Sequence, residues 1–162
     1  MLPNHFISAD EQAELQLFTE SLERFCDAEI EPHYRTWEKA GRVPRDLLRK
    51  MGENGYLCAD VPDTYGGPGA SVPFSFAVVE VLSRRGYGGF VGGLQVHNDI
   101  IPPYLLHCGT EAQRQYWLPR MASGEAIAAI GMTEPGAGSD LKAIRTTARK
   151  DGDHYVINGS KI

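Results

Sequence analysis

Hydrophobic positions at helical spacing define the first part of the chain. Apolar residues recur three or four positions apart between Leu15 and Phe25, which places them on one face of an α-helix. Ser8 and Glu11 precede this run in the S-x-x-E form of a capping box, in which side chains pair the first free amides of a helix. The pattern predicts a helix that begins after Ser8 and ends near Pro32.

The same spacing predicts four more helices. They cover about residues 44–55, 72–85, 94–107 and 110–121. Pro44 is expected in the first turn of its helix, and Gly52 and Gly55 are expected to close it. Pro102 and Pro103 are expected to kink the fourth of these five helices.

A glycine-rich segment at residues 86–93 precedes the helix at 94–107. It lacks the G-x-G-x-x-G spacing of a nucleotide-binding turn and follows a helix instead of a strand. We interpret it as a loop that lets helices approach closely, with the next helix beginning within or just after it. Residues 63–71, rich in glycine and proline, are predicted to form another loop.

The pattern changes after Gly124. The short apolar run at 126–132 predicts a strand, and residues 145–150 and 154–157 predict a hairpin around Asp151-Gly152-Asp153. Asn158-Gly159 indicates another turn, so residues 160–162 are expected to open a further strand.

Helices followed by strands, without alternation, indicate a multi-domain α+β protein. We expect an all-α helical domain over residues 1–125, followed over residues 126–162 by the first strands of a β domain.

Composition narrows the classes of partner. The 162 residues are 42% hydrophobic and 23% charged, and the net charge of −5 argues against nucleic acid. No apolar run approaches the roughly 20 residues that cross a bilayer, so no membrane span is expected. Acidic residues outnumber basic ones in residues 1–35, which we interpret as one solvated helix face. Three widely spaced cysteines favour free thiols in a reducing, cytoplasmic compartment.

The segment from Thr133 to Asp140, with the sequence TEPGAGSD, is the strongest candidate for chemistry. Its glycines would let backbone amides approach an anion, and Thr133 and Ser139 add hydroxyl donors. The same residue types are ordinary in a plain turn, with Asp140 capping residues 141–143, so both interpretations stay open.

Other side chains offer less. The histidines lack the spacing of a metal site, and no Gly-x-Ser-x-Gly elbow is present, so no metal ligand or hydrolytic nucleophile is assigned. His97 is expected either to line a pocket or, in our preferred interpretation, to pack between helices.

The sequence IGMTEPGAGSD at residues 130–140 resembles the first signature of the acyl-CoA dehydrogenases. The continuation through Asp151-Gly152 to VINGSKI at 156–162 is similar to that family in the same register. Further segments fit as well: EPH at 31–33, WEKAG at 37–41, YGG at 65–67, GTEAQ at 109–113 and LPRMASG at 118–124. The resemblance is nearest to the long-chain branch.

The resemblance implies an architecture and a cofactor. Members have an N-terminal helical domain, a middle β domain and a C-terminal four-helix domain, bind FAD between the domains, and form homodimers or homotetramers. This chain would be the N-terminal portion, with its middle domain beginning at residue 126.

The resemblance also implies site residues. Ile130 and Met132 would lie along the isoalloxazine ring, and the Met132 amide and Thr133 hydroxyl would donate to its pyrimidine edge. Gly138 and Ser139 would contact the pyrophosphate, and Ser139 would also face the CoA substrate. The helix at 94–107 would help to wall the acyl pocket.

The implied reaction is α,β-dehydrogenation of an acyl-CoA thioester in fatty acid β-oxidation. A carboxylate removes the α-proton, the β-hydride passes to flavin N5, and electron-transfer flavoprotein is the expected acceptor. The expected compartment is the cytoplasm, or the mitochondrial matrix in a eukaryote.

The family's catalytic base belongs to the C-terminal domain, and none of Glu125, Glu134 and Asp140 matches it. We therefore assign no catalytic residue and expect the isolated 162-residue chain to be inactive. The alternatives are a non-catalytic binding or regulatory remnant and a flavin oxidase or monooxygenase of the same fold.

Overall fold

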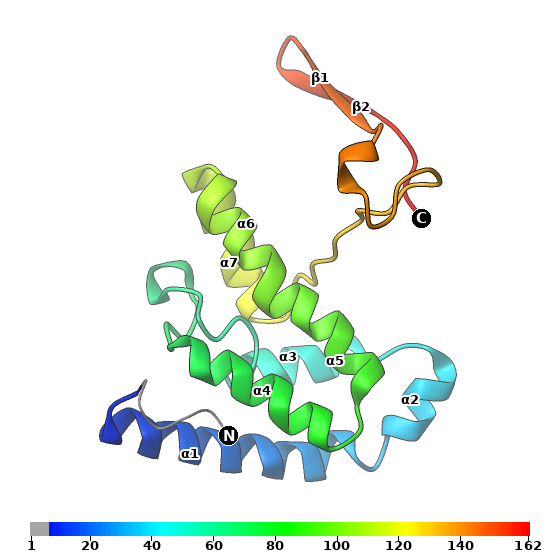
Figure 1. Cartoon of the computed structure of the whole chain (residues 1–162). Helices are drawn as coiled ribbons and strands as arrows, with labels where there is room; N and C mark the ends of the chain where they lie inside the picture. The colour runs from blue at the N-terminus through cyan, green and yellow to red at the C-terminus, as the bar shows by residue number, and fades with distance from the viewer. Residues whose placement is uncertain (1–6) are drawn as a thin grey trace. The chain divides into compact units, whose positions relative to one another are not determined.

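The computed structural model describes residues 7–162 and divides the chain into two compact units (Figure 1). The described residues of the first unit, 7–129, are mainly helical, and Ile130–Ile162 contains a two-stranded antiparallel sheet. This arrangement confirms the predicted α+β fold class, with helices first and strands after them.

The first helix, α1 (Ala9–Phe25), forms where the apolar spacing predicted it. The Ser8 hydroxyl accepts from the Glu11 amide at 3.1 Å, and the Glu11 carboxylate accepts from the Ser71 hydroxyl. The helix continues as a π turn, Cys26–Ile30, and so ends before Pro32 as predicted.

A short helix that the apolar spacing did not predict follows, α2 (Tyr34–Ala40). Its anchor is Tyr34, which is buried and packs against the Tyr87 ring with 4.4 Å between the ring centroids. Gly41 ends α2 in a left-handed conformation with φ of 65°, which glycine adopts without a steric penalty.

The next helix, α3 (Arg45–Glu53), has Pro44 at its N-cap and not inside its first turn. Gly52 lies inside α3, so the prediction that it closes the helix is wrong. A Cβ atom at position 52 would lie 2.5 Å from the carbonyl carbon of Ser123. Glycine is therefore required here because the end of another helix approaches the α3 backbone.

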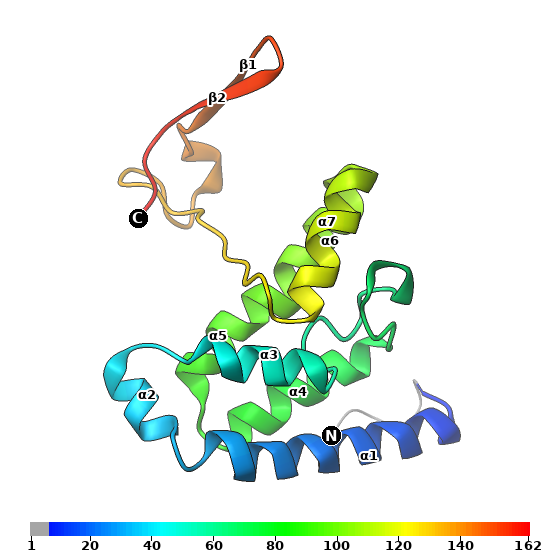
Figure 2. The ribbon, with the colours of Figure 1, turned by 180° about the vertical axis from the view of Figure 1, so that it is seen from behind.

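The remaining helices of this unit are α4 (Val72–Arg84), α5 (Gly88–Gln95), α6 (Ile101–Cys108) and α7 (Glu111–Ala122), with a π turn at Val96–Ile100 between α5 and α6. A 3₁₀ turn, Asp63–Tyr65, lies in the predicted loop. Helices α1 and α4 run side by side in both views (Figures 1 and 2).

The predicted capping box at the start of α7 forms in full between Thr110 and Gln113. Among the described residues, no helix combines the length and hydropathy that spanning a membrane requires.

Helix α5 begins at Gly88, within the glycine-rich segment 86–93, as the prediction allowed, so the loop is shorter than that segment. Each glycine lowers helix propensity by about 1 kcal/mol, but Val91 and Leu94 are buried in the core and hold the segment helical. The expected close approach is wrong, since a Cβ atom at Gly88, Gly92 or Gly93 would meet nothing within 4 Å.

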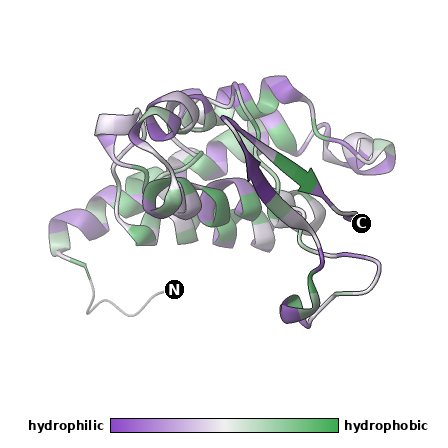
Figure 3. Cartoon of the chain, turned by 90° about the horizontal axis from the view of Figure 1, so that it is seen from above, coloured by the Kyte–Doolittle hydropathy of each residue, from purple (hydrophilic) through white to green (hydrophobic). Residues whose placement is uncertain are grey.

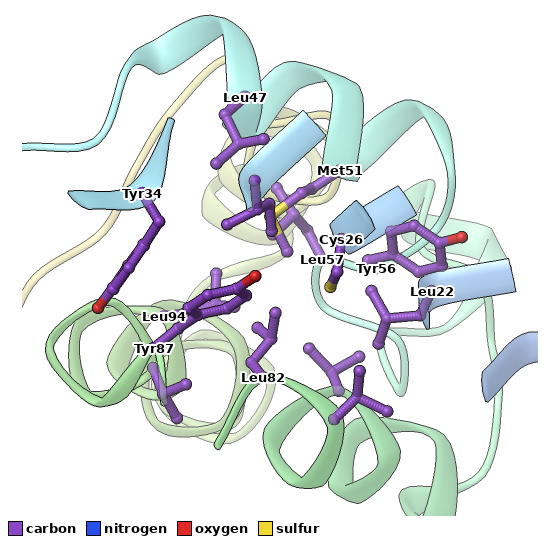
Figure 4. Close-up of a cluster of buried hydrophobic side chains, with 14 residues drawn as sticks. Leu22, Cys26, Tyr34, Leu47, Met51, Tyr56, Leu57, Leu82, Tyr87 and Leu94 are labelled. Carbon is purple, nitrogen blue, oxygen red and sulfur yellow. The ribbon is translucent and has the colours of Figure 1, made fainter. Parts of the chain in front are cut away.

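One apolar cluster joins helices α1, α3, α4 and α5 (Figure 4). Leu22, Met51 and Leu82 are fully buried in it, and Tyr56 is 2% exposed. Burying an aliphatic side chain of this size contributes about 1.5–3 kcal/mol. The helical unit therefore has a core of its own.

Acidic residues of the α1 region meet basic residues at the end of α4. Arg85 Nη1 donates to Asp27 at 2.6 Å, its Nε donates to Glu23 at 2.7 Å, and Arg84 donates to Glu23 at 2.8 Å. The Tyr87 hydroxyl donates to Glu31. The interpretation of the acidic run as a solvated face is therefore wrong for Glu23, which is partly buried, whereas Glu31 is exposed.

The second unit contains the predicted hairpin, β1 (Thr147–Asp151) and β2 (His154–Asn158). Asp151 pairs with His154, and Gly152 takes the left-handed conformation of a tight turn. Hydrophilic β1 and hydrophobic β2 contrast clearly in Figure 3. Residues 126–132 and 160–162 form no strand, so those two predictions are wrong.

Replacing Arg85 with Met should lower the free energy of unfolding by about 1–3 kcal/mol, because it leaves the partly buried Glu23 carboxylate without its main donors. Urea unfolding followed by circular dichroism measures this change. Arg49→Met is the matched control, since the Arg49–Asp46 pair is exposed and should contribute about 0.5 kcal/mol or less. Equal losses in both variants would contradict the assigned role of Arg85.

Candidate functional site

The segment predicted to carry chemistry forms a tight turn within the unit Ile130–Ile162. The Ala137 amide donates to the Glu134 carbonyl at 3.1 Å, and the Glu134 amide donates to the Ala137 carbonyl at 2.9 Å. Pro135 and Gly136 occupy the corner, where proline's fixed φ and missing donor suit a turn. The two ends of the motif therefore leave the turn as neighbouring backbone segments.

The Glu134 side chain, 7% exposed as a whole residue, anchors this turn. Its carboxylate accepts from the Arg145 amide at 2.7 Å, the Thr146 amide at 3.0 Å and the Thr146 hydroxyl. The Lys161 ammonium donates to it at 3.0 Å. These hydrogen bonds, the Arg145 amide first among them, lower the pKa of Glu134 from 4.5 to about 2. A carboxyl group this acidic is a fixed anion and a poor proton acceptor at neutral pH.

Lys161 and Ile162 fix the stretch before the turn. The Lys161 ammonium also donates to the Met132 carbonyl at 3.1 Å, and the Ile162 amide donates to the Thr133 carbonyl at 3.0 Å. Both carbonyls of this stretch are thus paired, which orients the Met132–Thr133 and Thr133–Glu134 peptide units.

Several hydrogen-bond donors between Met132 and Ser139 have no acceptor within the described residues. Across residues 7–162, the amides of Met132, Gly138 and Ser139 and the hydroxyls of Thr133 and Ser139 donate to no acceptor. Met132 is 43% exposed, and Thr133, Gly138 and Ser139 are exposed as well. Ile130 is partly buried. An oriented backbone with unpaired amides and hydroxyls fits an anionic or carbonyl-bearing ligand.

Asp140 caps the short 3₁₀ turn Leu141–Ala143, as one of the two interpretations predicted. Its carboxylate accepts from the Lys142 amide at 3.2 Å. The cap leaves the amides of Gly138 and Ser139 free, so the turn and an anion site are compatible.

His97 lies in the helical unit, in the π turn, and is 1% exposed. Its Nδ1 accepts from the Ala128 amide at 3.2 Å, so the proton resides on Nε2, which donates to the Met121 carbonyl at 3.1 Å. Burial lowers the pKa of His97 and keeps the ring neutral. These contacts support the interpretation of His97 as a packing residue and show a second use, holding Ala128.

Asn98, beside it, joins the π turn to a strained loop. Its Oδ1 accepts from the Cys58 amide at 3.1 Å, and its Nδ2 donates to the Tyr56 carbonyl at 3.2 Å. Cys58 has φ of 49°, which is uncommon for a residue other than glycine. The amide of Asn98 thus stabilises a backbone conformation that sequence analysis did not identify.

The buried thiols are not nucleophiles. Burial raises the pKa of Cys26 to about 12 and raises that of Cys58 as well, so both stay protonated at neutral pH. Within residues 7–162, no three side chains of the metal-binding types lie close enough to hold an ion.

The turn and the helical unit both match one protein family. The model for the acyl-CoA dehydrogenase N-terminal domain matches residues 12–125, and the model for the acyl-CoA dehydrogenase middle domain matches residues 129–162. The chain belongs to the acyl-CoA dehydrogenase family.

Relatives within the family are similar in both sequence and structure. The long-chain specific, mitochondrial acyl-CoA dehydrogenase of Sus scrofa is 42% identical over 93% of this chain. The acyl-CoA dehydrogenase structure from Geobacillus kaustophilus is 46% identical over 97% of this chain, with a TM-score of 0.87. That from Bacillus anthracis, complexed with FAD, is 35% identical over 99% of this chain, with a TM-score of 0.85.

The chain spans about a third of the long-chain relative, 34% of its length. It covers 40% of the Geobacillus kaustophilus acyl-CoA dehydrogenase chain and 27% of that from Bacillus anthracis. The match therefore concerns the N-terminal domain and the beginning of the middle domain of this family.

Sequence analysis missed two residues that shape the acyl-CoA dehydrogenase signature. Glu134 was considered only as an unsuitable base, and Lys161 had no assigned role. Their contacts join residues 11 to 29 positions apart. The roles of these two residues depend on a contact between a buried carboxylate and a lysine far away in the sequence, and local sequence patterns do not reveal such a contact.

Gly159→Ala should disrupt the anchor of the turn, because a Cβ atom there would lie 2.1 Å from the Thr146 hydroxyl oxygen. Hydrogen exchange at the Arg145 and Thr146 amides should become faster by about fivefold, as expected when a hydrogen bond contributing about 1 kcal/mol is lost. Gly131→Ala is the control, since its Cβ atom would lie 3.8 Å from its nearest neighbour. Unchanged exchange in Gly159→Ala would rule out the close packing.

Lowering the pH should release the turn only in strong acid. The folded pKa of Glu134 is depressed to about 2, so its stabilisation is present above the ordinary value of 4.5 and is lost as the pH falls through about 2. The NMR shifts of the Arg145 and Thr146 amides should therefore titrate near pH 2 in the chain. A midpoint near 4.5 would show that the carboxylate lacks these partners in solution.

Proposed function

We propose that this chain is the N-terminal part of an FAD-dependent acyl-CoA dehydrogenase. In this proposal residues 1–125 form the helical domain, and residues 126–162 begin the FAD-binding middle domain. The reaction is the α,β-dehydrogenation of an acyl-CoA thioester, as in fatty acid β-oxidation.

The observation that carries this proposal is the set of unpaired donors on an oriented turn. The Met132 carbonyl accepts from the Lys161 ammonium and the Thr133 carbonyl accepts from the Ile162 amide, whereas the Met132 amide and the Thr133 hydroxyl have no acceptor within residues 7–162. A ligand with acceptor atoms along one edge would satisfy both donors. The FAD bound by the relative from Bacillus anthracis is a ligand of this kind.

Bound FAD would accept the hydride, and negative charge accumulates at the pyrimidine edge of its ring on reduction. The Met132 amide and Thr133 hydroxyl would donate to that edge and stabilise the charge. Ile130 and Met132 would lie along the ring, Gly138 and Ser139 would donate to the pyrophosphate, and Ser139 would also contact the CoA substrate.

The partners follow from the same proposal. The substrate is an acyl-CoA, with residues 94–107 helping to wall the acyl pocket, and electron-transfer flavoprotein is the acceptor. The complete protein is a homodimer or homotetramer in the cytoplasm or the mitochondrial matrix.

The test uses the full-length protein that carries this chain. Purified protein should contain stoichiometric FAD, and saturated acyl-CoA thioesters should bleach the flavin absorbance without oxygen. Absence of bound flavin, or flavin that no acyl-CoA reduces, would overturn the proposal. Rapid hydrogen peroxide release would indicate the oxidase alternative.

Thr133→Val should weaken FAD binding and slow flavin reduction, each by about fivefold to tenfold, because one hydrogen bond worth about 1 kcal/mol is lost. Equilibrium titration with FAD and stopped-flow reduction measure the two effects. Thr147→Val is the control, since Thr147 is exposed at the start of β1. Identical behaviour of both variants would remove the role assigned to the Thr133 hydroxyl.

A further inference from the structure

An ion pair between a buried glutamate and a partly exposed lysine lies next to the backbone proposed to hold the flavin. Lys161 Nζ is 3.0 Å from Glu134 Oε1, and the side chains of Glu134 and Lys161 are 6% and 34% exposed. The same ammonium is 3.1 Å from the Met132 carbonyl oxygen. The pair therefore brackets the Met132–Thr133 peptide unit, with the cation on its carbonyl and the anion on the residue that follows.

The lysine side chain is placed by its contacts. A Cβ atom built on Gly131 would lie 3.8 Å from both Cβ and Cγ of Lys161, so the lysine stem runs past Gly131 at ordinary contact distance. The next residue, Ile162, donates its amide to the Thr133 carbonyl at 3.0 Å. The ammonium thus reaches the Met132 carbonyl from a backbone that is itself fixed to the same stretch.

We propose that the Glu134–Lys161 ion pair tunes the reduction potential of the flavin held at Met132 and Thr133. This inference rests on the proposed FAD site. Glu134 contributes a fixed negative charge one residue from the Thr133 donor, and Lys161 contributes a positive charge in contact with the Met132 carbonyl. With both present, the two charges offset each other where negative charge accumulates on reduction.

The other donors to Glu134 are neutral: two backbone amides and the Thr146 hydroxyl. Lys161 is its one cationic partner within residues 7–162. Removing the lysine charge would leave the negative charge of Glu134 without a compensating cation, and this charge would oppose flavin reduction. Removing the glutamate charge would leave the positive charge of Lys161 uncompensated, and this charge would favour flavin reduction.

The direction in which each variant shifts the flavin reduction potential distinguishes an electrostatic role from a purely structural one. Both residues hold the same turn, so loss of either would loosen it in the same direction. An electrostatic role instead predicts that Lys161→Met lowers the flavin potential and Glu134→Gln raises it. The double variant, which removes both charges, should lie between them.

The experiment measures the midpoint potential of FAD in the full-length protein, at fixed pH, by equilibrium with reference dyes. Each single variant should change the equilibrium constant for flavin reduction by about tenfold, which is about 30 mV for a two-electron couple. Lys150→Met in β1 is the matched control, because it removes an exposed lysine of the same unit and should leave the potential unchanged.

Lys161→Arg keeps the charge and should retain the wild-type potential, which maintains the test if Glu134→Gln does not fold. Shifts of the same sign in Lys161→Met and Glu134→Gln, or equal potentials for Lys161→Met and Lys161→Arg, would overturn the inference. Such results in a protein with bound, reducible FAD would leave the proposed function intact. A wild-type protein without FAD would overturn the proposed function itself.

Discussion

Buried backbone groups outside helices and strands must find hydrogen-bond partners, and this requirement shapes both units of the chain. In the helical unit, Asn98 pairs the Cys58 amide and the Tyr56 carbonyl, and His97 accepts from the Ala128 amide. In the second unit, Glu134 pairs the amides of two successive residues. Each side chain replaces hydrogen bonds that regular structure would have supplied. The irregular segments are ordered for that reason.

Structural elements that depend on residues close together in the sequence could be predicted from it. The caps at Ser8 and Thr110 depend on residues three positions apart, and the hairpin depends on the glycine at its corner. Helix α5 could not be predicted as surely, because its glycines oppose helix formation and only the buried Val91 and Leu94 stabilise it. Residues 126–132 have the composition of a strand, but a strand forms only where a second strand offers its backbone.

In the candidate site, too, features with local causes could be predicted from the sequence, and features that depend on distant contacts could not. Thr133 and Ser139 could be selected from the sequence because hydroxyls and glycines in a turn have an evident use. The residues that orient them could not, because Lys161 acts on Met132 across 29 positions. The low pKa of Glu134 also fits the absence of any catalytic assignment for this residue. Its hydrogen bonds hold it ionised, which suits an anchor and disfavours proton transfer.

The π turn between α5 and α6 has a consequence for the length of the chain. Each residue advances an α-helix by about 100°, so a wider turn shifts the phase between the residues before and after it. Loss of one residue from Val96–Ile100 would rotate every side chain of α6 by that angle and move Pro102 away from its buried position. A loop such as 63–71 absorbs a change in length at little cost. The π turn therefore fixes the rotational phase of α6, so a change in its length would alter which side chains of α6 are buried.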